Sequence, residues 1–332
     1  MKRIGITTTV PMEVIFASGN IPVDLNNIFI TDEDATSLVE KAEERGFPRN
    51  SCAWIKGIYT AALKSQVDIV IGVSEGDCSN THALLEVLKK DGVEVLDFRF
   101  PRQRNAHRLA ESTKQLSQSL GASPQEINKV WQALRGIRRK LGKLDQLTVE
   151  GKVTGFENHL WQVSASDFNG DYRQFEKDLD QKIVEISRRD VKRNGVRLGY
   201  IGVPPIIGNL YSEIEEMAGM VVFNEVQRQF TLADGIETNL LEGYLNYFTY
   251  PYSLEHRLKD INKQIKLRDL DGLIHYTQSF CYRAIEDIVI RDMVDIPVLK
   301  LEADKPGQLD GRNKLRLEAF IDMLGDMRRI KG

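Results

Sequence analysis

The feature that most constrains the fold of this chain is an internal repeat with an offset of 203 positions, the distance from Cys78 to Cys281 (281 − 78 = 203). With that offset, "VDIVI" (67–71) falls on "LDGLI" (270–274) and "VEVL" (93–96) falls on "IPVL" (296–299), without a gap. The starts "RIGITTTVP" and "RLGYIGVPP" also match, since each has an arginine eight residues before a proline. Self-similarity at a fixed offset indicates a repeated structural unit. We therefore expect two lobes of the same topology.

Each half of the sequence reads as strand, loop, helix, strand, loop with cysteine, helix and strand. Short apolar runs with turn signals on both sides are typical of fully buried parallel strands. Strands that alternate with helical segments indicate a doubly wound sheet. The predicted fold class is therefore α/β, with two flavodoxin-like doubly wound parallel-sheet lobes related by the repeat.

The segment between the lobes has a helical pattern. "SPQEINKVWQALRGIRRKLGKLDQL" (123–147) opens with a capping box from Ser123 to Glu126 and places Pro124 at the first helical position. "DYRQFEKDLDQKIVEISRR" (171–189) predicts a second helix. We therefore expect three parts: an N-terminal α/β lobe with Cys52 and Cys78 (1–100), a mostly helical insert (101–194) and a C-terminal α/β lobe with Cys281 (195–332).

The first helix of the insert carries a basic cluster. Two interpretations stay open: a solvated helix face, or a patch that binds an anionic partner or a phosphate-bearing ligand. The cluster comprises Arg135, Arg138, Arg139, Lys140 and Lys143.

Composition excludes several classes of protein. The formal net charge of −3 and the pI of about 6.1 argue against nucleic acid as a partner, which usually meets a basic face. No apolar run approaches the roughly 18 residues of a membrane span, and the N-terminal segment lacks the apolar core of a signal peptide. Three cysteines are an odd, sparse set that does not suit a disulfide framework. We therefore expect a cytoplasmic protein.

The cysteines follow strand ends and precede helices. Cys78 and Cys281 each lie five residues past an apolar run, counted from Val73 and Tyr276. Ligands of open α/β sheets bind beyond the carboxyl ends of the strands. A helix also starts after Cys52, and the dipole and free N–H groups at a helix start favour a thiolate. The cysteines are therefore either ligands of a metal or cluster, or small buried hydrophobic residues.

If the lobes face each other, Cys78 and Cys281 converge and Cys52 adds a third ligand. Three thiolates fit a [4Fe–4S] cluster with one iron open to solvent or substrate. Their softness also permits zinc, although the five histidines offer no clear zinc pattern. Two candidate catalytic residues accompany them. Ser79 directly follows Cys78, and Glu255 occupies the position in the second half that Cys52 has in the first. Glu255 either points toward the site or is a surface carboxylate at a helix start.

Four segments carry a family resemblance that runs over nearly the whole chain. They are "VPMEVIFASGNIPVDL", "NSCAWIKG", "SFCYRAIEDIVI" and "DIPVLKLEADKPGQLDGRNKLRLEAFIDML", of which the last is the most specific. With these segments the chain resembles the 2-hydroxyacyl-CoA dehydratases and benzoyl-CoA reductases. It is similar to their cluster-bearing subunits, of which the D-component of 2-hydroxyglutaryl-CoA dehydratase is one.

The resemblance implies an oxygen-sensitive [4Fe–4S] cluster held by Cys52, Cys78 and Cys281. It implies an ATP-hydrolysing iron–sulfur activator that supplies one electron at low potential. That electron makes a ketyl radical of a thioester substrate, most often an acyl-CoA, so that hydroxide leaves. It also implies a dimer with a second copy or a paralogous cluster-bearing subunit.

One loop departs from the family pattern. Family members commonly end this strand with a Cys-Asp pair, whereas this chain reads Ser74-Glu75-Gly76-Asp77-Cys78, so that the thiol comes about two residues later. The shift leaves the substrate and the cluster geometry open. The alternatives are an electron-relay or accessory iron–sulfur protein, a reductase of a non-CoA substrate, and a two-lobed ligand-binding module with structural cysteines.

Overall fold

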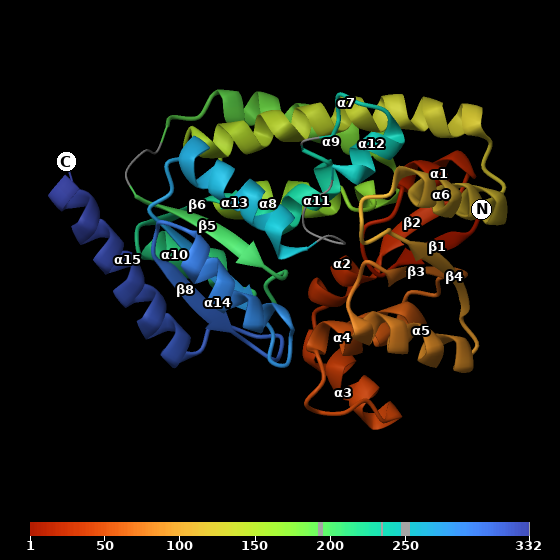
Figure 1. Cartoon of the computed structure of the whole chain (residues 1–332), viewed down its shortest axis with the longest axis horizontal. Coiled ribbons are helices and arrows are strands. Elements are labelled where there is room, and N and C mark those ends of the chain that lie inside the picture. The colour runs from red at the N-terminus through yellow and green to blue at the C-terminus, as the bar shows by residue number, and fades with distance from the viewer. Residues whose placement is uncertain (192–194, 234, 247–252, 332) are drawn as a thin grey trace.

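The structure is a computed structural model that describes residues 1–191, 195–233, 235–246 and 253–331 (Figure 1). The expected domain limits at residues 194 and 332 lie outside these ranges. None of the helices in the described ranges has the length and apolar character needed to cross a membrane.

The first lobe and the helical segment after it occupy residues 3–187. The lobe contains β1 (Arg3–Ile6), α1 (Met12–Ala17), β2 (Ile21–Asp24), α2 (Leu25–Ile30), α3 (Ala35–Arg45), α4 (Ala53–Lys64), β3 (Ile69–Glu75), α5 (Ser79–Lys90) and β4 (Glu94–Arg99). The helical segment contains α6 (Ala106–Leu120), α7 (Pro124–Val149), α8 (Gly155–Ser164), the short 3₁₀ helix η1 (Phe168–Gly170) and α9 (Tyr172–Ser187).

The second lobe follows the same plan and ends in a long helix. It contains β5 (Val196–Gly202), α10 (Leu210–Glu216), β6 (Gly219–Asn224), α11 (Glu225–Thr231), α12 (Leu240–Leu245), α13 (Leu254–Leu267), β7 (Gly272–Thr277), α14 (Arg283–Met293), β8 (Val298–Glu302) and α15 (Gly311–Lys331).

Each lobe is built on a four-stranded sheet in which every pair of neighbouring strands is parallel. The orders are β2-β1-β3-β4 and β6-β5-β7-β8, which is the flavodoxin-like arrangement. The predicted fold class is confirmed. The sequence pattern missed one strand in each half, β2 and β6. Both are edge strands beside the first strand of their lobe, whereas the opposite edge strands β4 and β8 were predicted from the repeated runs "VEVL" and "IPVL".

The strand registers confirm the repeat. In the first sheet Val70 pairs with Val95, and in the second Leu273 pairs with Val298. Both members of the second pair lie 203 positions after those of the first. The offset found in the sequence is therefore the offset of the pairing itself.

The same pair of hydrogen bonds joins the central strands of both sheets. The N–H of Arg3 donates to Asp68 Oδ2 at 2.7 Å, and the N–H of Asp68 donates to the carbonyl of Arg3 at 2.8 Å. In the second lobe Arg197 and Asp271 make the same two bonds at 2.7 and 2.8 Å. We call each pair an Arg–Asp clamp. Each clamp holds the start of β1 or β5 against the start of β3 or β7.

The insert packs against the first lobe and also reaches the second. As predicted, Ser123 caps α7 by accepting the N–H of Glu126 at 3.2 Å, and Pro124 is the first helical residue. The side chain of Glu126 pairs with Lys129, so the structure gives only the Ser123 half of the predicted capping box. α7 then runs along one side of the molecule (Figure 1). Its buried residues Leu134, Ile137 and Leu141 share one hydrophobic core with the strands β1 and β3. The core therefore continues from the first lobe into the insert.

The basic cluster of α7 is not a uniformly solvated face. Arg138 is only 2% exposed, and its Nη1 lies 2.5 Å from Oε1 of buried Glu13 on α1. The hydroxyl of Tyr244, on α12, donates to the other oxygen of Glu13 at 2.9 Å. A guanidinium cannot be buried without a partner, and Glu13 supplies one. This contact joins the first lobe, the insert and α12.

Glycine at position 202 allows β5 and β7 to approach closely. Gly202 has φ +112°, and a Cβ there would lie 2.1 Å from the carbonyl oxygen of Tyr276.

Gly46 has φ +116° with nothing within 4 Å of such a Cβ. We expect Gly46→Ala to lower the free energy of unfolding by about 1 kcal/mol through its backbone alone. We expect Gly202→Ala to lower the free energy of unfolding by about 1–3 kcal/mol more than Gly46→Ala does, because β5 and β7 must separate to make room for the Cβ. Urea unfolding of both variants measures the difference, and equal losses would contradict the steric argument.

Candidate functional site

All three cysteines line one cavity of about 270 Å³, called here the cysteine pocket. Its walls come from both lobes and from α8 of the insert. They include Thr7, Thr8, Asp24, Asn26, Cys52, Asp77, Cys78, Ser79, Thr81, His159, Val163, Gly202, Val203, Gln229, Gln278, Phe280, Cys281 and Tyr282. The structure therefore brings together Cys52 and Cys78 of the first lobe with Cys281 of the second.

The sheet topology explains why the pocket lies where it does. In each sheet the strand order reverses between the two central strands, so the loops after these strands diverge and leave a crevice. Thr7 follows β1 and Cys78 follows β3, whereas Val203 follows β5 and Cys281 follows β7. Since all four line the pocket, the crevices of the two lobes open into the same cavity.

The predicted helix starts are confirmed. Cys52 is the N-cap residue of α4, and Cys78 is the N-cap residue of α5. Cys281 lies one residue before Tyr282, the N-cap residue of α14, and its carbonyl accepts the N–H of Ala284 at 2.9 Å. All three cysteines are free and partly exposed.

Burial outweighs the helix starts in setting the protonation of these thiols. Burial raises the pKa of Cys52 to about 11, although the N–H groups of Ile55 and Trp54 lower it. Burial raises the pKa of Cys78, and the carboxylate of Asp77 raises it further. Burial also raises the pKa of Cys281, against the lowering effect of the backbone and charge of Arg283. The expected thiolates are therefore thiols in the metal-free chain, and only a bound cation would make them good ligands.

Alkylation of the metal-free chain tests the protonation state. Because each pKa unit lowers the thiolate fraction about tenfold, we expect Cys52 to react with iodoacetamide at pH 7.5 roughly 100-fold more slowly than in the urea-unfolded chain. The rate should rise steeply above pH 9. Peptide mapping by mass spectrometry measures it, with the unfolded chain as control. Equal rates for the folded and unfolded chains would show that burial does not suppress the thiolate.

The loop before Cys78 directs this residue into the cysteine pocket. β3 continues to Glu75 with a register shift between Val73 and Glu75, and Gly76 then turns the chain with φ +99°. The carboxylate of Asp77 accepts the N–H of Cys78 at 2.7 Å and the hydroxyl of Thr81 at 2.9 Å. Asp77 therefore holds the first turn of α5 while the side chain of Cys78 lines the pocket.

The two other predicted site residues have different surroundings. Ser79 is exposed, begins α5 and lines the cysteine pocket beside Cys78. Glu255 lies in the first turn of α13 with a side chain that is 71% exposed, and it pairs with Lys259 at 2.9 Å. Glu255 does not line the cysteine pocket. The structure therefore brings Ser79 to the cysteines and leaves Glu255 outside.

A buried ionic network lies beside the second-lobe side of the pocket. Arg257 donates from Nε and Nη2 to the two carboxylate oxygens of Glu225 at 2.6 and 2.9 Å, and it also pairs with Glu286. The N–H of Gly202, a pocket residue, donates to Glu225 Oε2 at 3.0 Å. Burial raises the pKa of Glu225, but the charge of Arg257 outweighs it and holds the pKa at about 2. The network thus ties α11, α13 and α14 to the end of β5.

Replacing Arg257 tests this network. Arg257→Met would leave Glu225 charged and buried, so we expect the free energy of unfolding to fall by about 3–5 kcal/mol at pH 7. A lowered carboxyl pKa stabilises the fold above its unfolded value of 4.5, and this stabilisation is lost as the pH falls toward 2. The deficit of the variant should therefore shrink below pH 4.5 in urea titrations. Lys259→Met, on the same helix, is the control and should not change stability measurably.

All three cysteine thiols face one cavity, and thiols are donors that suit a soft metal or a cluster. Among the residues that the structure describes, no group of three or more His, Cys, Asp or Glu side chains converges closely enough to hold one metal ion. A single zinc needs sulfur ligands at about 2.3 Å, whereas a cluster binds its cysteines through different iron atoms. Three thiols spread around one cavity therefore fit the ligand set of a cluster.

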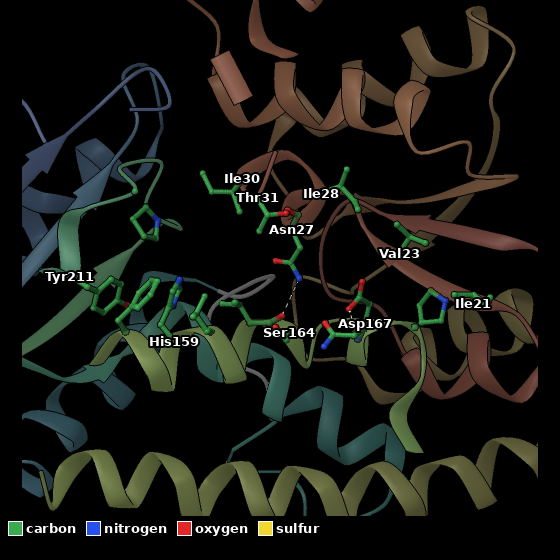
Figure 2. Close-up of a pocket in the computed structure, with 18 of the residues that line it drawn as sticks. Ile21, Val23, Asn27, Ile28, Ile30, Thr31, His159, Ser164, Asp167 and Tyr211 are labelled. Atoms are coloured by element: carbon green, nitrogen blue, oxygen red, sulfur yellow. Dashed lines mark hydrogen bonds between the residues drawn. The ribbon is translucent and has the colours of Figure 1, made fainter. Parts of the chain in front are cut away.

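A larger pocket of about 530 Å³ adjoins the cysteine pocket (Figure 2). Asn27 of α2 and Thr31, the C-cap residue of α2, extend into it, opposite His159 on α8. His159 stacks on Tyr211 with ring centroids 5.1 Å apart, and burial lowers its pKa to about 4. The two pockets share wall residues, which are Asn27, Ile30, His159, Val163 and Pro205. A ligand seated at the cysteines therefore has a largely apolar space beside it.

Two buried aspartates lie in the walls of these pockets. Asp24, at the end of β2, lines the cysteine pocket, and Asp167, before η1, lines the larger one. The N–H of Asp24 donates to Asp167 Oδ2 at 2.8 Å. Burial raises the pKa of Asp24. Burial, followed by the nearby charge of Asp24, raises the pKa of Asp167 to about 7.

Sequence reasoning missed several of the lining residues. Thr7 and Thr8 follow the first strand directly, so the rule that ligands bind beyond strand ends could have found them. Asp167 and His159 carry no such signal, because they lie in the helical insert and reach the pockets only through its packing.

The chain matches the family model described as "2-hydroxyglutaryl-CoA dehydratase, D-component" over residues 7–324. Among solved structures it is similar to the SBP FpvC of Pseudomonas aeruginosa in complex with Ni²⁺, at 16% identity over 100% of this chain and 98% of that chain, with a TM-score of 0.23. The same protein in complex with Mn²⁺ gives 14% identity over 100% of both chains and a TM-score of 0.22. TM-scores this low do not establish a shared fold or function. No curated protein matches the chain.

Proposed function

The chain belongs to the 2-hydroxyglutaryl-CoA dehydratase D-component family, and from this premise we propose that it is the iron–sulfur subunit of a 2-hydroxyacyl-CoA dehydratase-type enzyme. In this proposal Cys52, Cys78 and Cys281 hold one [4Fe–4S] cluster. The observation that carries the proposal is that these three residues, from two lobes, line one pocket at the carboxyl ends of the central strands.

The bound cluster would supply one-electron chemistry at low potential, with the electron delivered by an ATP-dependent iron–sulfur activator. The chain itself binds and orients the substrate. Ser79 stands beside Cys78 and has a hydroxyl to offer to a ligand. Val203 and Phe280 supply apolar wall beside the cysteines.

An acyl-CoA thioester is the substrate class that we propose. Its carbonyl would lie in the cysteine pocket, and the adjoining pocket of about 530 Å³ has the size and apolar lining of a small-molecule site. We further propose that the subunit pairs with a second copy or a paralogous cluster-bearing subunit. Free cysteines are in keeping with a cytoplasmic location.

Anaerobic reconstitution with iron and sulfide tests the proposal. We expect about four iron per chain, and loss of this iron in Cys52→Ala, Cys78→Ala and Cys281→Ala with the fold retained by circular dichroism. Glu255→Gln is the control and should keep the wild-type iron content, because its side chain lies outside the pocket. A folded wild-type chain that takes up no iron would overturn the cluster.

Turnover separates an enzyme from an electron relay. With the activator, ATP and 2-hydroxyglutaryl-CoA present, we expect the loaded chain with its partner subunit to release water and the unsaturated thioester. Ser79→Ala should bind iron normally and turn over more slowly. Full iron loading without turnover of any 2-hydroxyacyl-CoA tested would favour the relay.

A further inference from the structure

The buried aspartates Asp24 and Asp167 connect the two pockets. Asp24 is 2% exposed and Asp167 is 9% exposed, and each lines a different cavity. Figure 2 shows Asp167 near Asn27, which belongs to the wall that both cavities share. The hydrogen bond of 2.8 Å from the N–H of Asp24 to Asp167 Oδ2 joins the two residues. The pair therefore lies between the cysteines and the larger pocket.

The hydrogen bonds of the pair come from neutral donors. Asp24 Oδ1 accepts the N–H and the side-chain amide of Asn26, both at 2.8 Å, and Asp167 Oδ1 accepts the N–H of Asn169 at 2.9 Å. Ser166 also bonds to the carboxyl of Asp24. In the part of the chain that the structure describes, neither carboxyl forms an ion pair with Lys, Arg or His. Two neighbouring buried carboxyls without a cation do not both ionise readily at neutral pH.

Helix capping does not account for a carboxyl at position 24. Asp24 caps α2 by accepting the N–H of Asn26. The equivalent residue of the second lobe is Asn224, at the end of β6, which caps α11 by accepting the N–H groups of Val226 and Gln227 at 2.9 and 3.3 Å. Asparagine and aspartate cap helices about equally well. An asparagine at position 24 would therefore cap α2 as well, and it would avoid burying a second carboxyl beside Asp167.

We propose that Asp24 and Asp167 together hold one proton at neutral pH and exchange it with the ligand in the cysteine pocket. The assignment of a ligand rests on the proposed function. In a dehydration, the C–H bond of the ligand breaks and its proton forms the O–H bond of the Asp24 carboxyl. That O–H then breaks as its proton joins the leaving hydroxide to give water. The exchange returns the pair to its starting state and neither gains nor loses electrons. Asp167 acts through Asp24 and is a positioning residue.

Other ionisable side chains line the two pockets together with the pair. In the larger pocket they are Arg3, His159 and Tyr211, and in the cysteine pocket they are Cys52, Asp77, Cys78, His159, Cys281 and Tyr282. His159 makes its hydrogen bonds to Gln227 and Asn224 rather than to the aspartates. The strongest charge acting on Asp167 is that of Asp24.

Infrared spectroscopy of the folded full-length chain without substrate tests the shared proton. Burial also raises the pKa of Asp77 to about 6, so the band of the pair is the C=O component that fades as the pH rises through about 7 and that changes in Asp24→Asn and Asp167→Asn. Asp24→Asn removes the neighbouring charge, so the remaining band of Asp167 should fade at lower pH. Asp167→Asn should shift the band of Asp24 in the same direction. Asp34→Asn is the matched control, because Asp34 caps the exposed start of α3 through the N–H of Ser37 at 3.1 Å.

Kinetics test the exchange with the ligand. In the reconstituted enzyme with 2-hydroxyglutaryl-CoA, Asp24→Asn should lower kcat about 100-fold, with iron content and KM kept. Asp34→Asn should leave kcat unchanged. A carboxyl band that Asp24→Asn and Asp167→Asn both leave unchanged, or a wild-type kcat in Asp24→Asn, would overturn the proposal. A titrating band in a chain that turns over no thioester would support the shared proton and count against the dehydratase assignment instead.

Discussion

The parallel pairing of the central strands, held at its start by the Arg–Asp clamps, is the constraint on which the rest of the structure depends. A clamp joins Arg3 to Asp68 in one lobe and Arg197 to Asp271 in the other. Because parallel strands run in the same direction, holding their starts together also brings their carboxyl ends to one edge. The loops that carry Cys78 and Cys281 therefore leave from the same edge as those that follow β1 and β5. The cysteine pocket is a consequence of this pairing.

Burial is the second constraint, because it decides the charge of the site. It keeps the thiols protonated and raises the pKa of Asp167, while cations of the second lobe keep Glu225 ionised. Asp167 and Glu225 differ in their pKa because different groups contact the two carboxyls. Arg257 meets Glu225 with two hydrogen bonds, whereas Asp167 accepts its hydrogen bonds from the uncharged backbone N–H groups of Asp24 and Asn169. Burial therefore favours the protonated forms of the three thiols and of Asp167, whereas Glu225 stays ionised in a fixed ion pair.

Much of the fold could be predicted, because it rests on local patterns. The buried runs around Val70 and Leu273 predicted parallel strands, and the offset between them predicted the repeat. The edge strands β2 and β6 were missed, whereas the edge strands β4 and β8 carry the repeated runs "VEVL" and "IPVL" and were predicted. The convergence of Cys78 and Cys281 was predicted from the repeat, with Cys52 added as a third residue, but the protonation of the thiols was not predicted. A helix start is visible in the residues after Cys52, whereas the apolar surroundings that raise its pKa come from distant parts of the chain.

The sequence by itself determined the two-lobed α/β architecture, the family of the chain and the placement of the cysteines at helix starts. These features depend on periodicity, spacing and short motifs, which act over a few turns of chain. Only the tertiary structure decided that Arg138 is buried against Glu13, that Glu255 faces solvent and that Asp24 lies beside Asp167. Asp24 and Asp167 are 143 residues apart. The packing of the insert against the first lobe brings them together, and the charge and exposure of a side chain depend on such neighbours.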